Sequence, residues 1–267
     1  IGQIGKAFRN EITPGNFIFR QREFEQMELE YFYNPKEEEK EFNYWRAYCM
    51  DFLKKIGIKE ENLRYRDHTK EELVFYSNAT TDIEYNYPQG WGELWGIADR
   101  TDYDLKTHIN HSKADLTYLD PETNERFIPY VIEPSVGVDR LFLAVITDAY
   151  KEETLEDGSI REVMSIHPAL APYKALVLPL VKKRHSEKAL EIYQKLSKKF
   201  MVTYDETGNI GKRYRRGDIA GTPFCITVDD DTLEKNTVTI RNRDTMKQDI
   251  VNIDEIENYI NEKISIS

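Results

Sequence analysis

Arginine, aromatic and carboxylate side chains recur at strand spacing in one stretch of this sequence, residues 5–32. Two apolar-alternating runs flank the segment ITPGN, whose Pro14 and Gly15 are typical of a turn, so the stretch is predicted to form a long antiparallel hairpin. Successive side chains of a strand point to opposite faces, so the first strand would place Arg9 and Glu11 on one face. One face of the returning strand would carry Arg20, Arg22, Phe24, Gln26 and Glu28. Such a surface suits a ligand that is anionic at one end, aromatic in the middle and cationic at the other, and ATP beside an amino acid is such a ligand.

A second chemically unusual segment is GWGELWGIADRTDYDL, residues 90–105, which carries three glycines in a predicted strand. Glycines in a strand indicate the close approach of another backbone or of a ligand. Alternation would place Glu93 and Trp95 on one face, where a buried carboxylate is costly unless a cation or a donor pairs with it. Arg100 and Asp102 follow, and an internal ion pair between them is as well supported as a role in binding.

The third segment is YVIEPSVGVDRLFLAVI, residues 130–146, in which the apolar period changes from that of a strand to that of a helix. The strand would carry Glu133 and Ser135 on one face, and the helix would begin near Gly137. A glycine at this bend lets a ligand approach the start of the helix, where Arg140 adds a cation. The alternative is that Arg140 is buried and only holds the junction together.

These segments resemble the motifs of one enzyme family. FRNE, FRQREF and FEQME resemble motif 2 of the class II aminoacyl-tRNA synthetases, in the form found in the dimeric glycyl-tRNA synthetases. Residues 90–105 resemble the segment WGELxGIAxRTDYDL of the same synthetases, and residues 130–146 resemble their motif 3. The matches occur in the family's order and together cover almost the whole chain. The resemblance implies an α/β fold class: an α+β catalytic domain on an antiparallel sheet flanked by helices, then an α/β anticodon-binding domain with a mixed sheet.

The resemblance also implies a reaction. Glycine and ATP would form glycyl-adenylate and pyrophosphate, and glycine would then pass to the 3′ end of tRNA(Gly). Such a reaction needs orientation and neutralised phosphates rather than a protein nucleophile. Arg9 and Arg140 would be the catalytic residues, with Arg9 on the α-phosphate and Arg140 on the terminal phosphates beside Arg20. Glu11 would accept from the adenine amino group, and Phe24 would stack on adenine. The implied ATP site comprises Arg9, Asn10, Glu11, Phe19, Arg20, Gln21, Arg22, Glu23, Phe24, Glu93, Leu94, Gly137, Val138, Asp139 and Arg140.

Glycine has no side chain to grip, so its ammonium group must supply the binding energy, and Glu28, Glu133 and Ser135 are the candidate receivers. The implied glycine site comprises Phe24, Glu25, Gln26, Met27, Glu28, Glu133, Pro134, Ser135, Val136 and Gly137. Larger amino acids would be excluded sterically. Magnesium, which accompanies ATP, would be held by Glu93 and Glu133.

Composition agrees with a soluble globular protein of one large or two ordinary domains. The chain has 267 residues, of which 40% are hydrophobic and 32% charged. It contains no apolar run long enough to cross a membrane and no visible signal peptide. Cys49 and Cys225 are isolated, so neither a zinc site nor a disulfide framework is indicated, and a cytoplasmic location is expected. The net charge of −11 argues against a dedicated nucleic-acid coat but does not exclude tRNA binding.

Helical periodicity between the first two segments predicts a helix that begins at Asn34 and Pro35 and ends at Gly57. Its stripe favours core packing over binding, and consists of Phe42, Trp45, Cys49, Phe52, Leu53 and Ile56. A short helix is predicted near residues 71–75.

The C-terminal part changes to alternating strands and helices after Pro168, so the predicted domains are 1–168, catalytic, and 169–267, anticodon-binding. Ser186 is predicted to cap the first helix of this second domain. Lys and Arg outnumber Asp and Glu between residues 174 and 216, which suggests a surface that faces phosphates. The candidate tRNA contacts are Lys212, Arg213, Arg215 and Arg216. A solvated helix face is the alternative.

The sequence begins at Ile1 in the middle of a predicted strand, and motif 1 of the family is not found in it. A fragment is therefore expected, and the full-length protein is expected to be a homodimer. Two other interpretations stay open. One is a synthetase-like accessory subunit that binds nucleic acid without catalysis. The other is a class II synthetase of prolyl or threonyl specificity.

Overall fold

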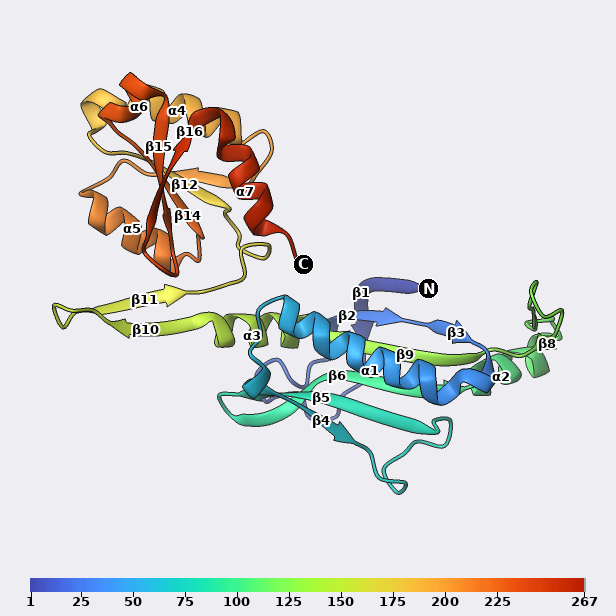
Figure 1. The fold of residues 1–267 in the computed structure, drawn as a ribbon. Helices are drawn as coiled ribbons and strands as arrows, with labels where there is room; N and C mark the ends of the chain where they lie inside the picture. The colour runs from blue at the N-terminus through green and yellow to red at the C-terminus, as the bar shows by residue number, and fades with distance from the viewer. Residues whose placement is uncertain (267) are drawn as a thin grey trace. The chain divides into compact units, whose positions relative to one another are not determined.

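The computed structural model describes residues 1–266. Its contacts divide the chain into two compact units, the first made of Ile1–Lys54 with Ile58–Thr147, and the second of Lys55–Gly57 with the residues from 148 onward. Helices and strands are combined in both units (Figure 1), so the α/β fold class predicted from the sequence is confirmed. The contacts change from one unit to the other at residue 148, whereas the sequence placed a domain boundary at residue 168.

A seven-stranded antiparallel sheet is the frame of the first unit. Its strand order is β1-β2-β9-β6-β5-β4, and β3 pairs with β9. The strands are β1 (Gly2–Phe8), β2 (Glu23–Leu29), β3 (Tyr31–Tyr33), β4 (Leu63–Asp67), β5 (Ala79–Tyr87), β6 (Gly90–Thr101) and β9 (Tyr130–Gly137). Because β6 and β9 are neighbours, residues 90–105 and 130–146 lie side by side although they are far apart in the sequence (Figure 1).

Helix α1 (Glu38–Lys55) covers one face of this sheet (Figure 1). The short helix η1 (Pro35–Glu37) precedes it, and the Asn34 side chain accepts a hydrogen bond from the Lys36 amide, so the predicted helix start is confirmed. The predicted stripe packs inward: Phe52 meets Trp95 of β6 with the ring centroids 5.7 Å apart. The other small elements of this unit are α2 (Tyr103–Ser112), α3 (Val138–Ala149), η2 (Glu60–Asn62), β7 (Tyr118–Leu119) and β8 (Arg126–Phe127). The short helix predicted near residues 71–75 is only a turn.

The N-terminal hairpin is shorter than predicted. Strand β1 ends at Phe8 and β2 begins at Glu23, so residues 9–22 form a loop. Asn16 and Phe17 take positive φ angles of 54° and 53°, which interrupt a strand, and one isolated bridge joins the two arms of the loop. The residues that were predicted on strands but lie in this loop are Arg9, Glu11, Arg20 and Arg22.

Strand β6 contains a bulge that changes the direction of Glu93. Ile83 of β5 pairs with Trp95, and the next residue, Glu84, pairs with Glu93, so Leu94 is an extra residue in β6. The prediction that Glu93 and Trp95 share a face was therefore wrong. Trp95 packs against α1, and Glu93 lines a cavity on the other face of the sheet.

The second unit holds the hairpin of β10 (Tyr150–Thr154) and β11 (Ile160–Met164), followed by a five-stranded sheet in the order β13-β12-β14-β15-β16. Strand β12 pairs in parallel with β13 and β14, and the other pairs are antiparallel, as expected for a mixed sheet. The strands are β12 (Ala175–Pro179), β13 (Val202–Tyr204), β14 (Phe224–Val228), β15 (Thr237–Asn242) and β16 (Gln248–Asn252). The helices are α4 (Lys182–Leu196), α5 (Ile210–Ile219), α6 (Asp230–Lys235), η3 (Ile253–Glu255) and α7 (Ile256–Ile264).

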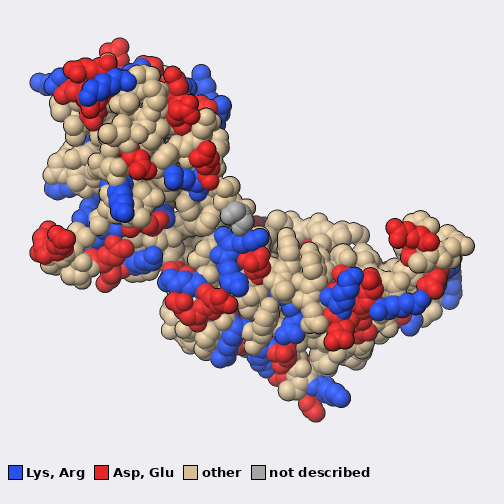
Figure 2. All heavy atoms as spheres, in the orientation of Figure 1, with Lys and Arg blue, Asp and Glu red and all other residues tan. Residues whose placement is uncertain are grey.

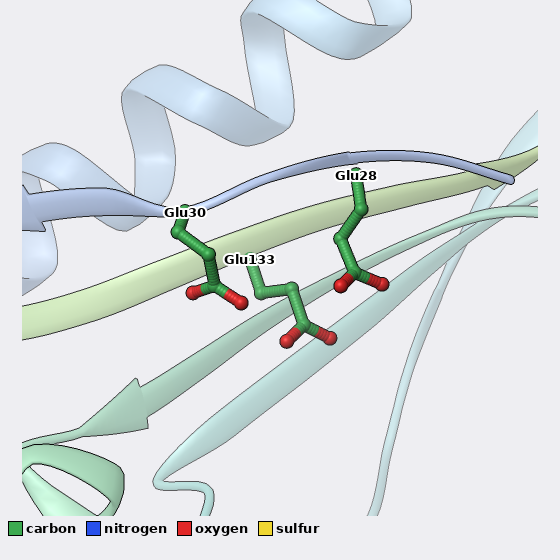
Figure 3. Close-up of side chains that lie close together, drawn as sticks. All are labelled: Glu28, Glu30 and Glu133. Atoms are coloured by element: carbon green, nitrogen blue, oxygen red, sulfur yellow. The ribbon is translucent and has the colours of Figure 1, made fainter. Parts of the chain in front are cut away.

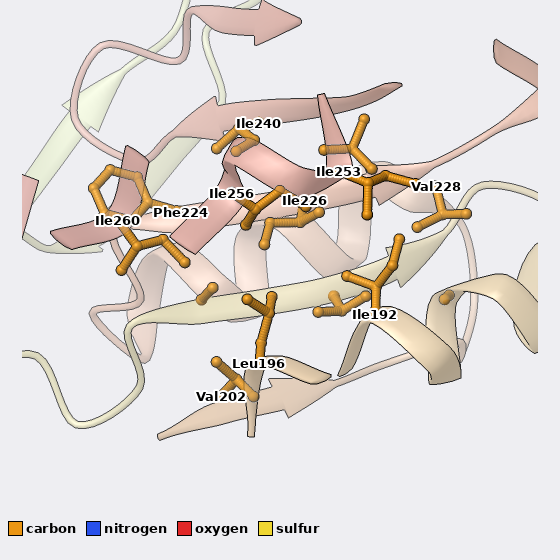
Figure 4. Packing of buried hydrophobic residues seen from close by; sticks show 14 residues of the cluster. Ile192, Leu196, Val202, Phe224, Ile226, Val228, Ile240, Ile253, Ile256 and Ile260 are labelled. Carbon is orange, nitrogen blue, oxygen red and sulfur yellow. The ribbon is translucent and has the colours of Figure 1, made fainter. Parts of the chain in front are cut away.

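Hydrophobic side chains from both helices and strands fill the core of the second unit (Figure 4). The labelled members include Ile192, Leu196, Phe224, Ile226, Ile256 and Ile260. The predicted helix start at Ser186 was wrong, because α4 begins one turn earlier at Lys182 and Ser186 donates instead to Glu206 at 3.0 Å.

Acidic and basic side chains are mixed on the face shown in Figure 2, with most Lys and Arg close to Asp or Glu. Within residues 1–266, none of the helices has the length and the hydrophobicity that crossing a bilayer requires.

Candidate active site

A cavity of about 840 Å³ lies on the sheet of the first unit. Its wall is formed by the 9–22 loop, the strands β2, β9, β6 and β5, the first turns of α2 and α3, and residues 68–76 before β5, with Glu30 and Phe32 after β2. Gly96, Ala98 and Arg100 alternate along β6 and face this cavity. Trp95 and Ile97 point away from it, toward the buried side of the sheet. The cavity therefore brings the three unusual sequence segments together.

The basic end of the cavity contains Arg140 from the first turn of α3. Its guanidinium donates to the backbone carbonyl of Glu93 at 3.0 Å and to that of Phe19 at 2.9 Å, and lies 5.3 Å from the centroid of the Phe19 ring. The side chain of Arg140 also approaches the Glu93 carboxylate at 3.4 Å. Two carbonyl acceptors thus fix the orientation of the guanidinium through its Nη1 and Nη2 atoms and leave its other N–H groups available.

Two more arginines, Arg9 and Arg20, both in the 9–22 loop, are exposed at the same end of the cavity. The Arg9 guanidinium lies 5.2 Å from the centroid of the Phe24 ring. Arg20 approaches the Glu11 carboxylate at 3.4 Å. Both side chains line the cavity, and exposed guanidinium groups are well suited to bind phosphate oxygens in pairs.

The acidic end of the cavity is a hydrogen-bonded group on β2 and β9. Gln26 donates to Glu28 at 2.9 Å and to the Ser135 hydroxyl, and that hydroxyl donates to Glu28 at 3.2 Å. One carboxylate oxygen from each of Glu28, Glu30 and Glu133 lies within 4.8 Å of the others, as Figure 3 shows. Burial, followed by the nearby Glu133 carboxyl, raises the pKa of Glu30 to about 8, and burial raises the pKa of Glu133. The three carboxyls are therefore crowded, and a bound cation would favour their ionised forms.

Arg100 is the counter-charge of this acidic group. Its guanidinium lies 2.9 Å from the Glu133 carboxylate, donates to Asp104 at 2.7 Å, and covers the Tyr76 ring at 4.5 Å from the centroid. The ion pair with Asp102 that the sequence allowed was wrong, because Asp102 pairs with Lys106 at 2.7 Å. Asp102 lies at the start of α2, and Lys106 is one helical turn further on, so these two side chains pair with each other. Arg100 pairs instead with Asp104 in the first turn of α2.

The predicted magnesium pair is not brought together. Glu133 pairs across the sheet with Ala98, five residues further along β6 than Glu93. At about 3.3 Å per residue, about 16 Å of strand separates the two backbones, too far for these two side chains to share one ion. Among the described residues, Glu93 also lies outside the three-carboxylate group.

Most of the predicted binding residues line the cavity. These are Arg9, Glu11, Phe19, Arg20, Gln21, Phe24, Glu25, Gln26, Glu28, Glu93, Leu94, Glu133, Ser135, Gly137, Asp139 and Arg140. Met27, Pro134 and Val136 do not, because strand alternation turns them to the opposite face, and their assignment to the glycine site is corrected.

Four other predicted ATP contacts also lie outside the lining: Asn10, Arg22, Glu23 and Val138. Glu23 pairs with Lys6 at the end of β1, and Arg22 donates to the Glu11 carbonyl at 3.1 Å. These two side chains hold the loop rather than the cavity.

Half of the residues that line the cavity were not predicted from the sequence. The additional lining residues include Ile18, Glu30, Phe32, His68, Glu72, Val74, Tyr76, Thr80, Asp82, Gly96, Ala98, Arg100, Asp104, Leu105, His108 and Val131. Period-two spacing from Leu94 could have identified Gly96, Ala98 and Arg100. The contribution of β5 and of the loop before it depends on strand order, and no local pattern reveals it.

In the second unit, the candidate tRNA residues lie on α5, and one of them needs a correction. Arg213 is buried at 4% exposure and donates to the carbonyls of Gly208 and Pro179, so it is a structural residue and not an exposed cation. Arg216 donates to Asp205 at 2.8 Å. Lys212 and Arg215 are exposed.

Comparisons with known proteins agree with this arrangement. Residues 174–263 match the family described as "Anticodon binding domain". The chain is 65% identical over 264 residues to a glycine–tRNA ligase of Clostridium acetobutylicum and 64% identical over 264 residues to that of Clostridium tetani. It is also 63% identical over 265 residues to the glycine–tRNA ligase of Geobacillus thermodenitrificans. Each alignment covers 99% of this chain and 57% of the relative, so the chain spans a little more than half the length of the curated relatives it matches.

A solved structure shares the fold. The prolyl-tRNA synthetase of Cryptosporidium parvum, solved with halofuginone and AMPPNP, superposes with a TM-score of 0.66 at 16% identity, over 98% of this chain and 52% of that one. At this identity the likeness concerns the fold alone. The resemblance expected from the motifs is thus confirmed: over nearly its whole length this chain is similar to a portion of the glycine–tRNA ligases that includes an anticodon-binding domain, and it has the fold of a class II aminoacyl-tRNA synthetase.

Proposed function

We propose that this chain is the part of a glycine–tRNA ligase that activates glycine with ATP and carries the anticodon-binding domain. Glycine and ATP give glycyl-adenylate and pyrophosphate, and glycine then passes to the 3′ end of tRNA(Gly). The observation that carries the proposal is the polarity of one cavity. Arg9, Arg20 and Arg140 lie at one end, and the acidic group around Glu28 and Glu133 lies at the other.

The basic end binds ATP in this proposal. Arg9 holds the α-phosphate and the glycine carboxylate, while Arg20 and Arg140 hold the outer phosphates. The fixed fork of each guanidinium matches the geometry of these anions. The adenine ring lies against Phe24, and its amino group donates to Glu11. Activation then depends on alignment of the glycine carboxylate with the α-phosphorus and on neutralisation of the charge that develops there.

The acidic end binds the glycine ammonium. Glu28 and Glu133 accept two of its N–H groups and Ser135 a third, because the hydroxyl can turn its lone pairs to the ligand. Arg100 keeps the Glu133 carboxylate in place from the other side. A larger side chain meets these hydrogen-bonded groups, so selection operates by exclusion.

Magnesium fits the basic end through Glu93. This carboxylate is 55% exposed and lies beside Arg140, and Mg²⁺ in such sites takes one or two carboxylates with phosphate oxygens and waters as its remaining ligands. The ion would neutralise phosphate charge. The Glu28–Glu30–Glu133 group is assigned to the ammonium instead, since Arg100 already occupies one side of it.

The second unit binds tRNA(Gly) in this proposal. Its match to an anticodon-binding family supports this, and exposed Lys212 and Arg215 on α5 are the candidate phosphate contacts. The full-length protein is proposed to be a cytoplasmic homodimer, on the strength of the resemblance to the dimeric glycyl-tRNA synthetases.

ATP–pyrophosphate exchange on the full-length protein tests the proposal. Exchange is expected with glycine, and not with alanine, proline or threonine. Exchange with proline or threonine but not glycine would overturn the specificity. Absence of exchange with every amino acid, together with retained tRNA binding, would instead favour a non-catalytic accessory subunit.

A further inference from the structure

The end of strand β6 has an unusual backbone just where it presents Arg100 to the cavity. Thr101 takes a φ angle of +54°, in the left-handed region. For a β-branched residue this conformation is a genuine outlier, and such outliers collect at functional sites when the surrounding structure enforces them. Thr101 does not line the cavity, whereas its neighbour Arg100 does.

A second bulge accompanies this outlier. Asp99 pairs with Ile132 of β9, and Thr101 pairs with the next residue, Val131, so Arg100 is the extra residue of β6. Bulges of this kind disrupt the hydrogen-bond ladder locally. Here the bulge falls on the residue whose side chain faces the cavity and pairs with Glu133 at 2.9 Å.

Asp99 holds this backbone from the buried side of the sheet. The side chain is 0% exposed, and its Oδ1 atom accepts the Thr101 amide at 3.0 Å. Its Oδ2 atom has no hydrogen-bond partner among residues 1–266, and burial raises the pKa of this carboxyl to about 6. Burying a carboxyl with only one hydrogen-bonded oxygen costs free energy. A side chain that is kept at this cost is expected to have a role, and the Thr101 amide is the group that this carboxyl holds.

We propose that Asp99 and Thr101 are positioning residues: the buried carboxyl holds the left-handed backbone at Thr101, which aims the Arg100 guanidinium at Glu133 and so orients the carboxylates that receive the glycine ammonium. This inference rests on the proposed function. The nucleotide end of the cavity lies at Arg9 and Arg140, and these residues are not part of this positioning arrangement.

The test separates the affinity for glycine from that for ATP in the full-length protein, by pyrophosphate exchange. Asp99→Ala is expected to raise the KM for glycine about tenfold and to leave the KM for ATP and kcat within about twofold. Asp99→Asn keeps an oxygen acceptor for the Thr101 amide and should restore a KM within about twofold of the parent. Equal increases in both KM values, or an Asp99→Asn variant as impaired as Asp99→Ala, would overturn the proposal.

A double-mutant cycle shows whether Asp99 acts through Arg100. Arg100→Ala should itself raise the KM for glycine, and adding Asp99→Ala to it should cause no further increase. Fully additive effects would show that Asp99 acts by another route. If wild-type protein shows no exchange with glycine, the proposed function fails; if it does and Asp99→Ala leaves the KM for glycine unchanged, only the positioning role fails.

Thr101→Gly gives an independent measurement should Asp99→Ala fail to fold. Glycine accepts a positive φ without strain, so the melting temperature should stay the same or rise. The KM for glycine should nevertheless rise about threefold, because the freer backbone no longer holds Arg100. A lowered melting temperature or an unchanged KM for glycine would contradict the assignment.

Discussion

The guanidinium of Arg140 donates a hydrogen bond of 2.9 Å to the backbone carbonyl of Phe19, 121 residues earlier in the chain. This bond joins the start of α3 to the 9–22 loop, which carries Arg9 and Arg20 of the cavity. The same guanidinium reaches the carbonyl of Glu93 on β6 at 3.0 Å. One side chain thus locks three chain segments together at the proposed phosphate site, so that the cation is oriented before a ligand arrives.

Arg140→Lys should therefore lower exchange by about 100-fold or more although it keeps the charge, since a single ammonium cannot reproduce the planar fork or both carbonyl contacts. The measurement is ATP–pyrophosphate exchange with saturating glycine on the full-length protein. Arg126→Lys is the matched control, because Arg126 is an exposed partner of Asp115 outside the cavity. An Arg140→Lys variant within threefold of the parent would argue against a phosphate-binding role.

Arg9→Ala should abolish adenylate formation without unfolding the protein. The Arg9 side chain is exposed and lies over the Phe24 ring, so its removal changes stability by no more than about 0.5 kcal/mol. Exchange assays and thermal melts of the same preparation check the two halves of this expectation. A large fall in melting temperature would make Arg9 a structural residue instead.

Glu28→Gln should weaken glycine binding selectively. A hydrogen bond to a charged group contributes about 1.5–3 kcal/mol, so the KM for glycine is expected to rise by about 10- to 100-fold with the KM for ATP nearly unchanged. Glu23→Gln serves as the control, because Glu23 lies on the same strand but pairs with Lys6 away from the cavity. If both variants have the same KM for glycine, the ammonium site lies elsewhere.

The pH dependence of the free energy of unfolding should reveal the raised pKa of Glu30, one of the three clustered carboxyls. The pKa of Glu30 is about 8 in the folded protein, above its ordinary value of 4.5, so the folded state holds a proton that the unfolded state has lost between these two values. Its contribution is fully present below pH 4.5, and the free energy of unfolding falls as the pH rises toward 8.

Glu30→Gln removes this titration, so its melting temperature should fall less than that of the parent between pH 5 and pH 8.5. Thermal melts across this range, without substrates, provide the measurement, and Glu39→Gln on the exposed side of α1 is the control. Parallel curves for Glu30→Gln and the parent would show that Glu30 does not carry the extra proton.

Two neighbouring cations of α5 should behave differently. Arg213→Ala leaves the carbonyls of Gly208 and Pro179 without their donor and is expected to destabilise the protein by about 3 kcal/mol. Lys212→Ala should leave the melting temperature unchanged and weaken tRNA(Gly) binding, with a smaller dependence of affinity on salt. Filter binding at several salt concentrations checks the second expectation. Unchanged tRNA affinity in Lys212→Ala would remove α5 from the proposed tRNA surface.

Local chemistry in the sequence was enough for several elements. Asn34 and Pro35 mark the start of the first long helix, and Gly137 marks the change from β9 to α3. In each case a cap or a change of period lies within a few residues of the feature it predicts. The motif residues of the cavity were found for the same reason, because each motif is a short segment with its own spacing.

Tertiary structure alone decided how these segments meet. The bulges at Leu94 and Arg100 depend on the register between β6 and its neighbours, and a shift of one residue turns a side chain to the other face. Register therefore placed Glu93 in the cavity and separated it from Glu133. The pairing of Arg100 with Glu133 depends on β9 lying beside β6. Burial of Arg213 was likewise invisible in a run of basic residues, since it depends on the carbonyls that the folded chain brings to it. The residue types that do chemistry were thus recognisable within short segments of the sequence. Their partners and directions arose from contacts between segments distant in the chain.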